Sequence, residues 1–156
     1  MPEVIIADTS CLIVLTNAGQ LDVLRLVYGK VAITPEIAGE YGATLPDWLI
    51  VKAVQDRSRV KLLSLQIDQG EASALALATE LPHSTVILDD QKARKLASRL
   101  SIRYTGTLGV VVKAKVQGYL PSIQPLLARL RTVGFRISPE LEAAALKLAG
   151  ELPAKD

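Results

Sequence analysis

The sequence predicts an α/β domain built on a short, mainly parallel sheet that helices cover on both faces. Short apolar runs rich in β-branched residues alternate with longer segments of helical periodicity, as in consecutive β–α units. Apolar residues make up 49% of the chain and aromatic residues only 4%, so aliphatic side chains must form most of the core. A length of 156 residues fits one core. We therefore expect a single domain over 1–150 and a C-terminal tail over 151–156.

The first strand is expected at residues 4–7, because a short β-branched run bounded by polar residues is typical of a buried strand. Asp8 ends this run and begins the triplet Asp-Thr-Ser, whose side chains suit the N-cap of a helix over 11–18. The helical spacing of apolar residues continues as far as Val27. The start of the chain is thus one β–α unit with an aspartate at its turn.

The second strand is expected at 31–33, and a helix follows it directly. Thr34 suits the N-cap of that helix and Pro35 suits its first position. Glu36 then lies near the positive end of the helix dipole, which explains its charge without any other role. Gly42 is expected to end the helix.

Residues 45–59 form the segment whose structure the sequence predicts least clearly. Residues 48–51 are a candidate strand. Residues 60–63 fit either another strand or the lead-in to the next helix, and both interpretations stay open.

The rest of the chain alternates again between strands and helices. Strands are expected at 85–88 and 103–105. Helices are expected at 68–80, 91–100, 107–116, 122–131 and 139–149.

Composition and motifs exclude several classes of protein. One cysteine permits no disulfide framework, and the net charge of +2 is only weakly basic. The chain contains no Walker-type phosphate loop, no glycine-rich turn after the first strand and no GxSxG elbow. His83 is the single histidine, so a histidine-based triad or zinc site is not expected. No signal peptide or membrane span is evident, and we expect a cytoplasmic protein with no membrane partner.

Acidic residues stand at the predicted strand ends and in the helices that follow them. Asp8 follows the first strand, and Asp89 and Asp90 follow the strand at 85–88. Glu40 lies on the helix after the second strand, and Glu71 lies in the first turn of the helix at 68–80. Because ligand sites of open parallel sheets lie beyond the carboxyl ends of the strands, these side chains are expected to share one crevice.

Each carboxylate also has a purely structural interpretation. Asp8, Asp89 or Asp90 can cap the helix that follows it, and Glu71 stands three residues after Asp68, the spacing of a capping box. Glu40 can be an ordinary solvated helix residue. The functional prediction therefore rests on the conjunction of these positions and not on any one of them.

A convergent group of carboxylates predicts a bound divalent cation. Close like charges repel by several kcal/mol at a partly buried site, on the order of 4 kcal/mol per pair, and a cation or raised pKa values relieve this repulsion. Oxygen ligands without histidine or cysteine favour Mg²⁺ or Mn²⁺ over zinc. Such a site suits hydrolysis of a phosphodiester bond.

The helix at 91–100 carries an apolar stripe and an adjoining basic face. Its apolar stripe, expected to pack on the sheet, comprises Ala93, Leu96, Ala97 and Leu100. Its basic residues are Lys92, Lys95 and Arg99. The basic face is either ordinary solvated surface or a ridge that contacts phosphates, and both interpretations stay open.

Five segments of the chain resemble motifs of the PIN domain family, in particular its DUF3368 branch, in the same order along the chain. These segments are 4–13, 33–40, 68–78, 88–97 and 105–110. The resemblance covers nearly the whole chain. It implies a three-layer α/β/α fold and an Mg²⁺- or Mn²⁺-dependent ribonuclease that acts on RNA. It also implies the role of a VapC-like toxin beside an antitoxin protein, and a homodimer.

The resemblance also implies roles for individual residues. The metal ligands it implies are Asp8, Glu40, Glu71 and Asp89. It further implies that Asp90 is a second ligand or positions water, and that Ser10 supplies a helper hydroxyl group.

The fourth of these motifs departs from the pattern of many PIN nucleases, which have a second aspartate followed by an aromatic residue. Lys92 and Ala93 occupy this part of the motif. A PIN-like module that binds nucleic acid or protein without cutting therefore remains the alternative function. A haloacid-dehalogenase-like phosphatase needs Asp-x-Asp after the first strand, where Ser10 stands, and a phosphoreceiver domain needs an acidic pair that Thr9 does not supply.

Overall fold

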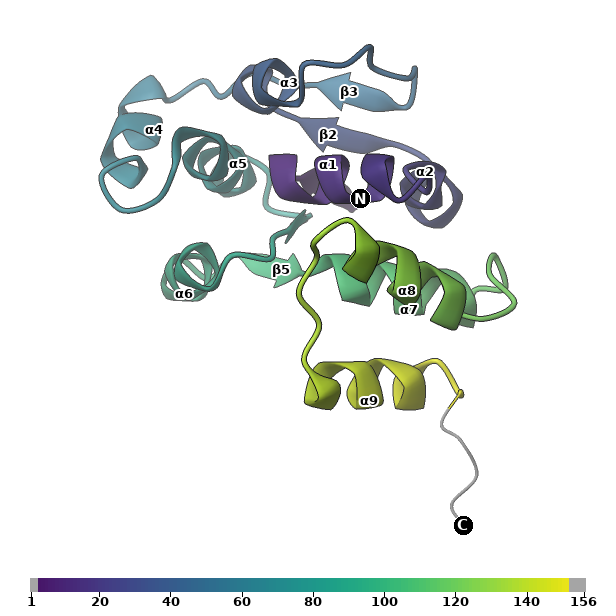
Figure 1. The fold of residues 1–156 in the computed structure, drawn as a ribbon. Coiled ribbons are helices and arrows are strands. Elements are labelled where there is room, and N and C mark those ends of the chain that lie inside the picture. Colours follow the sequence, from purple (N-terminus) through teal and green to yellow (C-terminus); the bar gives the residue numbers. More distant parts are fainter. Residues whose placement is uncertain (1–2, 152–156) are drawn as a thin grey trace.

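The computed structural model describes residues 3–151, which form a five-stranded, all-parallel sheet surrounded by helices (Figure 1). The strands, in the order β3-β2-β1-β4-β5 across the sheet, are β1 (Val4–Ala7), β2 (Val31–Ile33), β3 (Leu49–Val51), β4 (Ser84–Ile87) and β5 (Arg103–Thr105). The helices are α1 (Thr9–Asn17), α2 (Asp22–Tyr28), α3 (Pro35–Tyr41), α4 (Arg57–Leu63), α5 (Gln69–Glu80), α6 (Gln91–Arg99), α7 (Thr107–Val116), α8 (Gln124–Thr132) and α9 (Pro139–Leu148). The predicted α/β class is confirmed.

Burial along the central strands shows that both faces of the sheet are covered. Ile5, Ile6 and Ala7 are consecutive residues of β1 and are all buried. Because neighbouring residues of a strand point to opposite faces, this burial requires cover on both sides. The edge strand β5 differs, and its Tyr104 remains 37% exposed.

The strand register places the turns after β1 and β4 beside each other. Ala7 pairs with Ile87, and the amide of Asp8 donates a hydrogen bond of 3.3 Å to the carbonyl oxygen of Ile87. The topological switch point of the sheet lies between these two strands, because β2 and β3 are added on one side of β1 whereas β4 and β5 are added on the other. This is the position at which open parallel sheets bind ligands.

The structure resolves one alternative that the sequence left open and corrects two local expectations. Residues 60–63 belong to helix α4 and not to a strand, because the Asp56 side chain caps that helix and Val60 and Leu63 are buried one turn apart. The helical pattern to Val27 divides into two helices, α1 and α2. Leu100 does not complete the buried stripe of α6: it follows the helix and is 41% exposed.

The C-terminal helices extend the fold beyond the sheet. Helix α7 packs against α2, and α9 packs against α7, below it in Figure 1. The carboxylate of Glu151 accepts hydrogen bonds from the Ser122 hydroxyl and the Ile123 amide and pairs with Lys115. Glu151, the first residue of the predicted tail, is thus tied to the domain, and 152–156 lie outside the described residues.

Within residues 3–151, no single helix is long and apolar enough to cross a bilayer. Helices α1 and α2 satisfy the length and composition only as a pair, which is bent by 117°.

Candidate functional site

Asp8 is a buried carboxylate at the carboxyl end of β1. It is 2% exposed and accepts a hydrogen bond of 3.0 Å from the amide of Cys11, so it caps α1 as its structural interpretation predicted. Burial, and to a smaller extent the charges of Asp89, Glu71 and Asp68, together raise the pKa of Asp8 to about 7 against the lowering effect of the Cys11 amide. Asp8 is therefore held among other acids in a poorly solvated position.

Asp89 lies beside it, after β4, and is fixed by the start of α7. The amide and the hydroxyl group of Thr107 donate to its two carboxylate oxygens at 2.9 and 2.6 Å. The guanidinium of Arg94 lies 3.9 Å from Asp89 Oδ1. Gly106 makes this approach possible, because a Cβ there would collide with the guanidinium of Arg94 and crowd the carboxylate of Asp89.

Glu71 lies in the first turn of α5, where Asp68 caps the helix. The Glu71 amide donates to Asp68 Oδ1 at 2.8 Å. Partial burial raises the pKa of Glu71 to about 7, and the nearby charges of Asp68 and Asp90 contribute in the same direction. Asp90 itself caps α6 and accepts a hydrogen bond from the Ala93 amide at 2.9 Å. Capping and membership of the acidic group thus coexist in these residues.

Glu40 reaches the same edge of the sheet from α3. Its carboxylate accepts a hydrogen bond of 2.5 Å from the hydroxyl group of Thr9, the residue after Asp8. It also lies over Gly70, the residue before Glu71, where an added Cβ would collide with the carboxylate. The lack of a side chain at Gly70 therefore gives Glu40 its place beside the start of α5.

Ser10 is the one predicted site residue that the structure leaves apart from the carboxylates. Its side chain is exposed, and no hydrogen bond joins it to Asp8, Glu40, Glu71, Asp89 or Asp90.

The acidic side chains are gathered but do not form a closed metal cage. Among residues 3–151, no three acidic, histidine or cysteine side chains are grouped tightly enough to hold a metal ion. Over the same residues, no lysine, arginine or histidine forms an ion pair with Asp8, Glu40 or Glu71. The chemistry of the donor set nevertheless fits a hard divalent cation: its atoms are all oxygens, only Asp89 has a basic partner, Arg94, among residues 3–151, and Gly70 leaves room for Glu40.

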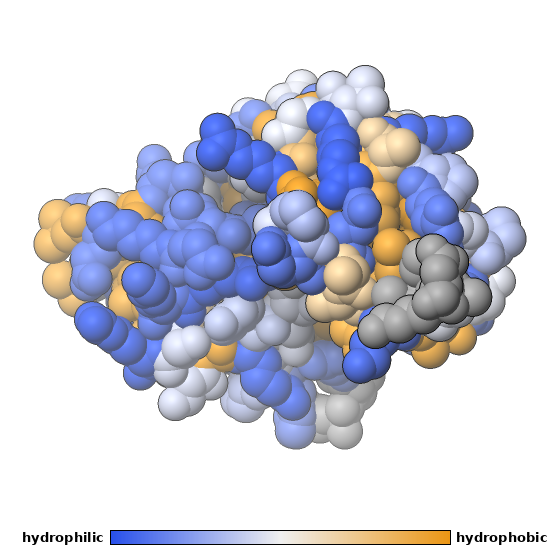
Figure 2. Space-filling view, turned by 60° about the horizontal axis from the view of Figure 1, so that its bottom comes forward, coloured by the Kyte–Doolittle hydropathy of each residue, from blue (hydrophilic) through white to orange (hydrophobic). Residues whose placement is uncertain are grey.

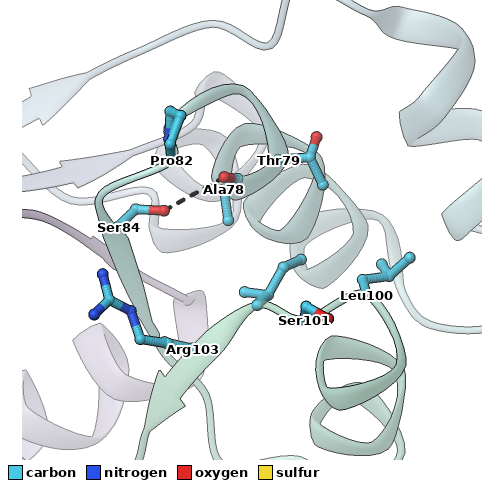
Figure 3. A pocket seen from close by; sticks show the side chains of 8 residues that line it. Ala78, Thr79, Pro82, Ser84, Leu100, Ser101 and Arg103 are labelled. Carbon is cyan, nitrogen blue, oxygen red and sulfur yellow. Dashed lines mark hydrogen bonds between the residues drawn. The ribbon is translucent and has the colours of Figure 1, made fainter.

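A different cavity, of about 270 Å³, lies at the opposite ends of the strands (Figure 3). Ser84 and Arg103, the first residues of β4 and β5, line it, and the Ser84 hydroxyl donates to the carbonyl oxygen of Ala78 at 3.4 Å. No acidic side chain lines this cavity. It is therefore separate from the carboxylate edge.

Comparison with known proteins agrees with this arrangement. The sequence model of the DUF3368 family, described as a PIN domain, matches residues 4–151, nearly the whole chain. The chain is a PIN domain of the DUF3368 family. Neither the curated proteins nor the solved structures contain a significant match to it.

Membership of the PIN family connects the acidic edge to a general chemistry. PIN domains are generally nucleases and generally use divalent metals. In this PIN domain, Asp8 and Asp89 follow the two strands at the switch point of the sheet, and the charges of Asp89 and of Glu71 from α5 both act on Asp8.

Sequence reasoning missed the residues that position the acids of this PIN domain. Thr9 holds Glu40, Thr107 holds Asp89, and Gly70 leaves space between α3 and α5. Asp68 was interpreted only as a cap partner, although its charge also raises the pKa of Asp8 and Glu71. The one available signal was the glycine between two acids in the first turn of α5, where alanine would be the better helix former.

Proposed function

We propose that this PIN domain is an Mg²⁺- or Mn²⁺-dependent endoribonuclease. The observation that carries the proposal is the buried carboxylate of Asp8, which has no basic partner among residues 3–151 and lies near the charges of Asp89, Glu71 and Asp68 at the switch point of the sheet. Bringing like charges together in a poorly solvated position is unfavourable unless a cation or a proton compensates them. PIN nucleases generally use divalent metals, and a bound metal ion would compensate these charges.

The residues proposed to hold the metal are Asp8, Glu40, Glu71, Asp89 and Asp90. A bound divalent cation would supply activation of water and stabilisation of charge on the phosphoryl oxygens. The threonine hydroxyls keep their acids oriented: Thr107 holds Asp89 through two hydrogen bonds, and Thr9 holds Glu40 through one. Ser10, which is exposed in the first turn of α1, is proposed as a helper hydroxyl that contacts the substrate.

The test is cleavage of labelled single-stranded RNA by the purified protein in Mn²⁺, in Mg²⁺ and in EDTA. We expect cleavage with either metal and none with EDTA. Glu71→Gln removes one negative charge at nearly constant shape and should lower the rate of cleavage about 100-fold or more. Metal-independent cleavage, or full activity of the variant, would contradict the proposal.

Binding without cleavage is the second candidate function. The observation that favours it is Lys92, an exposed cation in the fourth motif, where many PIN nucleases have an acid. Under this alternative the RNA remains intact in Mn²⁺ while it is still bound in EDTA. The cleavage assay in Mn²⁺, together with a measurement of RNA binding in EDTA, therefore separates the two functions.

We further propose that the protein is the toxin of a type II toxin–antitoxin pair and forms a homodimer. A groove of about 390 Å³ between α7 and α9 is lined by exposed apolar side chains, among them Val116 at 67%, Leu141 at 53% and Leu148 at 70%. Figure 2 brings the bottom of the view in Figure 1 forward and shows hydrophobic residues exposed among hydrophilic ones on that face. Light scattering of wild type and Leu148→Asp tests the dimer, which the variant should dissociate. A monomeric wild type would contradict it.

A further inference from the structure

Another cavity, also of about 390 Å³, opens beside Asp89. Asp89 and Arg94 line this cavity together with Gly106, the residue before α7. Phe135 and Arg136 come from the segment that joins α8 to α9, and Leu141 comes from the first turn of α9. The C-terminal part of the chain thus returns to the edge of the sheet that carries the acids. A volume of this size is in the range of small-ligand sites.

Helix caps fix the aromatic side of this cavity. Gly134, with φ of +93°, ends α8, and the amides of Gly134 and Phe135 donate to the carbonyl oxygens of Arg131 and Leu130. This is a Schellman motif, which holds the residue after the glycine in one backbone position. The side chain of Arg131 secures the next turn through Glu142 and the carbonyl oxygen of Ile137. Phe135, half-buried, is therefore presented from a rigid turn.

The two arginines that line the cavity differ in how many interactions they already make. Arg94 is held in place, because its Nε donates to the carbonyl oxygen of Leu88 at 2.6 Å and its guanidinium lies 5.1 Å from the ring centre of Tyr104. Arg136 is exposed and has no hydrogen bond or ion pair with any residue between 3 and 151. An apolar ring and a free guanidinium thus stand together at one entrance.

We infer that this cavity binds one nucleotide of the RNA strand, adjacent to the bond that is cut. The base lies against Phe135, and the phosphate of that nucleotide contacts Arg136. Stacking on an aromatic ring accepts any base, and a guanidinium binds phosphate through paired hydrogen bonds. The inference rests on the proposed function, because it names where the same substrate lies relative to Asp89.

The test compares variants that separate stacking from packing. Phe135→Leu keeps an apolar side chain but removes the ring, whereas Phe135→Tyr keeps the ring. Affinity for a fluorescent single-stranded RNA is measured by anisotropy in Ca²⁺, and a gel verifies that the RNA remains intact. We expect Phe135→Leu to weaken binding about 5-fold or more. Phe135→Tyr should stay within about 2-fold of wild type by the same reasoning, since every ring offers a stacking face.

Arg136→Ala tests the phosphate contact, with Arg129→Ala as its matched control. Arg129 is an exposed arginine of α8 that does not line the cavity. Arg136→Ala should lower the slope of log affinity against log salt by about 0.7, the value for one phosphate contact on a single strand. The control should leave the slope unchanged. Thermal melts of all variants verify that each is folded.

Three outcomes are distinguishable. Weakened binding by Phe135→Leu and Arg136→Ala, with both Phe135→Tyr and Arg129→Ala like wild type, supports the subsite. Wild-type binding by Phe135→Leu and Arg136→Ala in a protein that still cleaves RNA in Mn²⁺ overturns the subsite and leaves the proposed function intact. A wild-type protein that neither binds nor cleaves RNA overturns both.

Discussion

At the scale of single residues, Asp8 is the carboxylate whose charge is least favourable, because it is buried and lies near other acids. A side chain that is 2% exposed receives one backbone hydrogen bond and faces other acids. Folding keeps it there because it also caps α1, so its structural role and its proposed role as a metal ligand are joined in one carboxylate. The two roles can be separated by replacing the charge while retaining the capping oxygen.

Asp8→Asn makes that separation. The pKa of Asp8 is raised from 3.8 to about 7 in the folded protein, so the native state holds its proton more tightly than the unfolded state does. Its contribution to stability therefore falls as the pH rises through this window, by an amount on the order of a few kcal/mol. Urea unfolding in EDTA at pH 5 and pH 8 should show a smaller loss in Asp8→Asn than in wild type. Equal losses in the two proteins would show that Asp8 carries no such charge conflict.

Gly70→Ala tests the space that Glu40 occupies. Alanine favours a helix over glycine by about 0.5–1 kcal/mol, and the atoms that the new Cβ meets belong to the movable end of the Glu40 side chain. We therefore expect an unchanged or higher melting temperature but a displaced carboxylate. Affinity for Mn²⁺ should fall about 10-fold or more, as for the loss of a residue that orients a ligand.

Gly39→Ala is the matched control for this substitution. Gly39 lies in the neighbouring helix α3, and a Cβ there meets no atom within 4 Å. This variant should gain the same helix stability and bind Mn²⁺ like wild type. If both variants bind the metal equally well, Glu40 does not act from the position in which the structure holds it.

At the scale of elements, α6 shows how one helix serves both core and surface. Ala93, Leu96 and Ala97 are buried, whereas Lys92 and Lys95 are exposed on the adjoining face. The helix starts at Asp90, so its first turn lies next to the acids. A basic face in this place is suited to offsetting the negative charge that an RNA strand would meet.

Replacing Lys92 and Lys95 together by alanine tests this face. Contacts to phosphates carry no sequence information, so binding of unrelated single-stranded RNAs should weaken alike. The salt dependence of log affinity should flatten by about 0.7 per lost contact. Lys30→Ala with Lys147→Ala removes the same charge from exposed positions elsewhere and is the control. Anisotropy is measured across a salt series. If both pairs of variants give the same slope, the basic face of α6 does not contact phosphates.

The last described residue joins the C-terminal helices to the domain. Hydrogen bonds from Ser122 and Ile123, and the Lys115 amine, lower the pKa of Glu151 to about 2, so the charged form stabilises the fold above its ordinary pKa of 4.5. Glu151→Gln should lower the free energy of unfolding at pH 7 by about 1–3 kcal/mol. The difference from wild type should shrink as the pH falls from 4.5 towards 2. Asp47→Asn, at an exposed acid, is the control in urea unfolding, and an equally small effect of both would contradict the role of Glu151.

At the scale of the whole molecule, the sequence predicted what depends on local pattern. Asp8 and Asp89 could be placed together because parallel strands end at one edge, and that edge is where the structure holds them. The hydroxyl of Thr107 and the empty space at Gly70 were out of reach, because both depend on helices packing across the sheet edge. For the same reason, the local sequence pattern did not indicate that Phe135 and Asp89 would line the same cavity.

The segment before α5 illustrates the limit at the level of an element. Residues 60–63 are apolar and short enough for a strand, and only the cap at Asp56 and packing against α5 make them helical. Local pattern could therefore not choose between the two interpretations, whereas tertiary contact does.

The central claim is that the acidic edge binds a divalent metal, and titration with Mn²⁺ tests it without knowledge of the RNA target. Electron paramagnetic resonance measures free Mn²⁺, which should decrease as wild-type protein is added. Saturating metal should also raise the stability of wild type, by about 2.7 kcal/mol at a hundredfold excess over Kd. Asp8→Asn should bind at least 10-fold more weakly, as expected when a ligand loses its charge. Equal binding by wild type and Asp8→Asn, or no binding by either, would contradict the account.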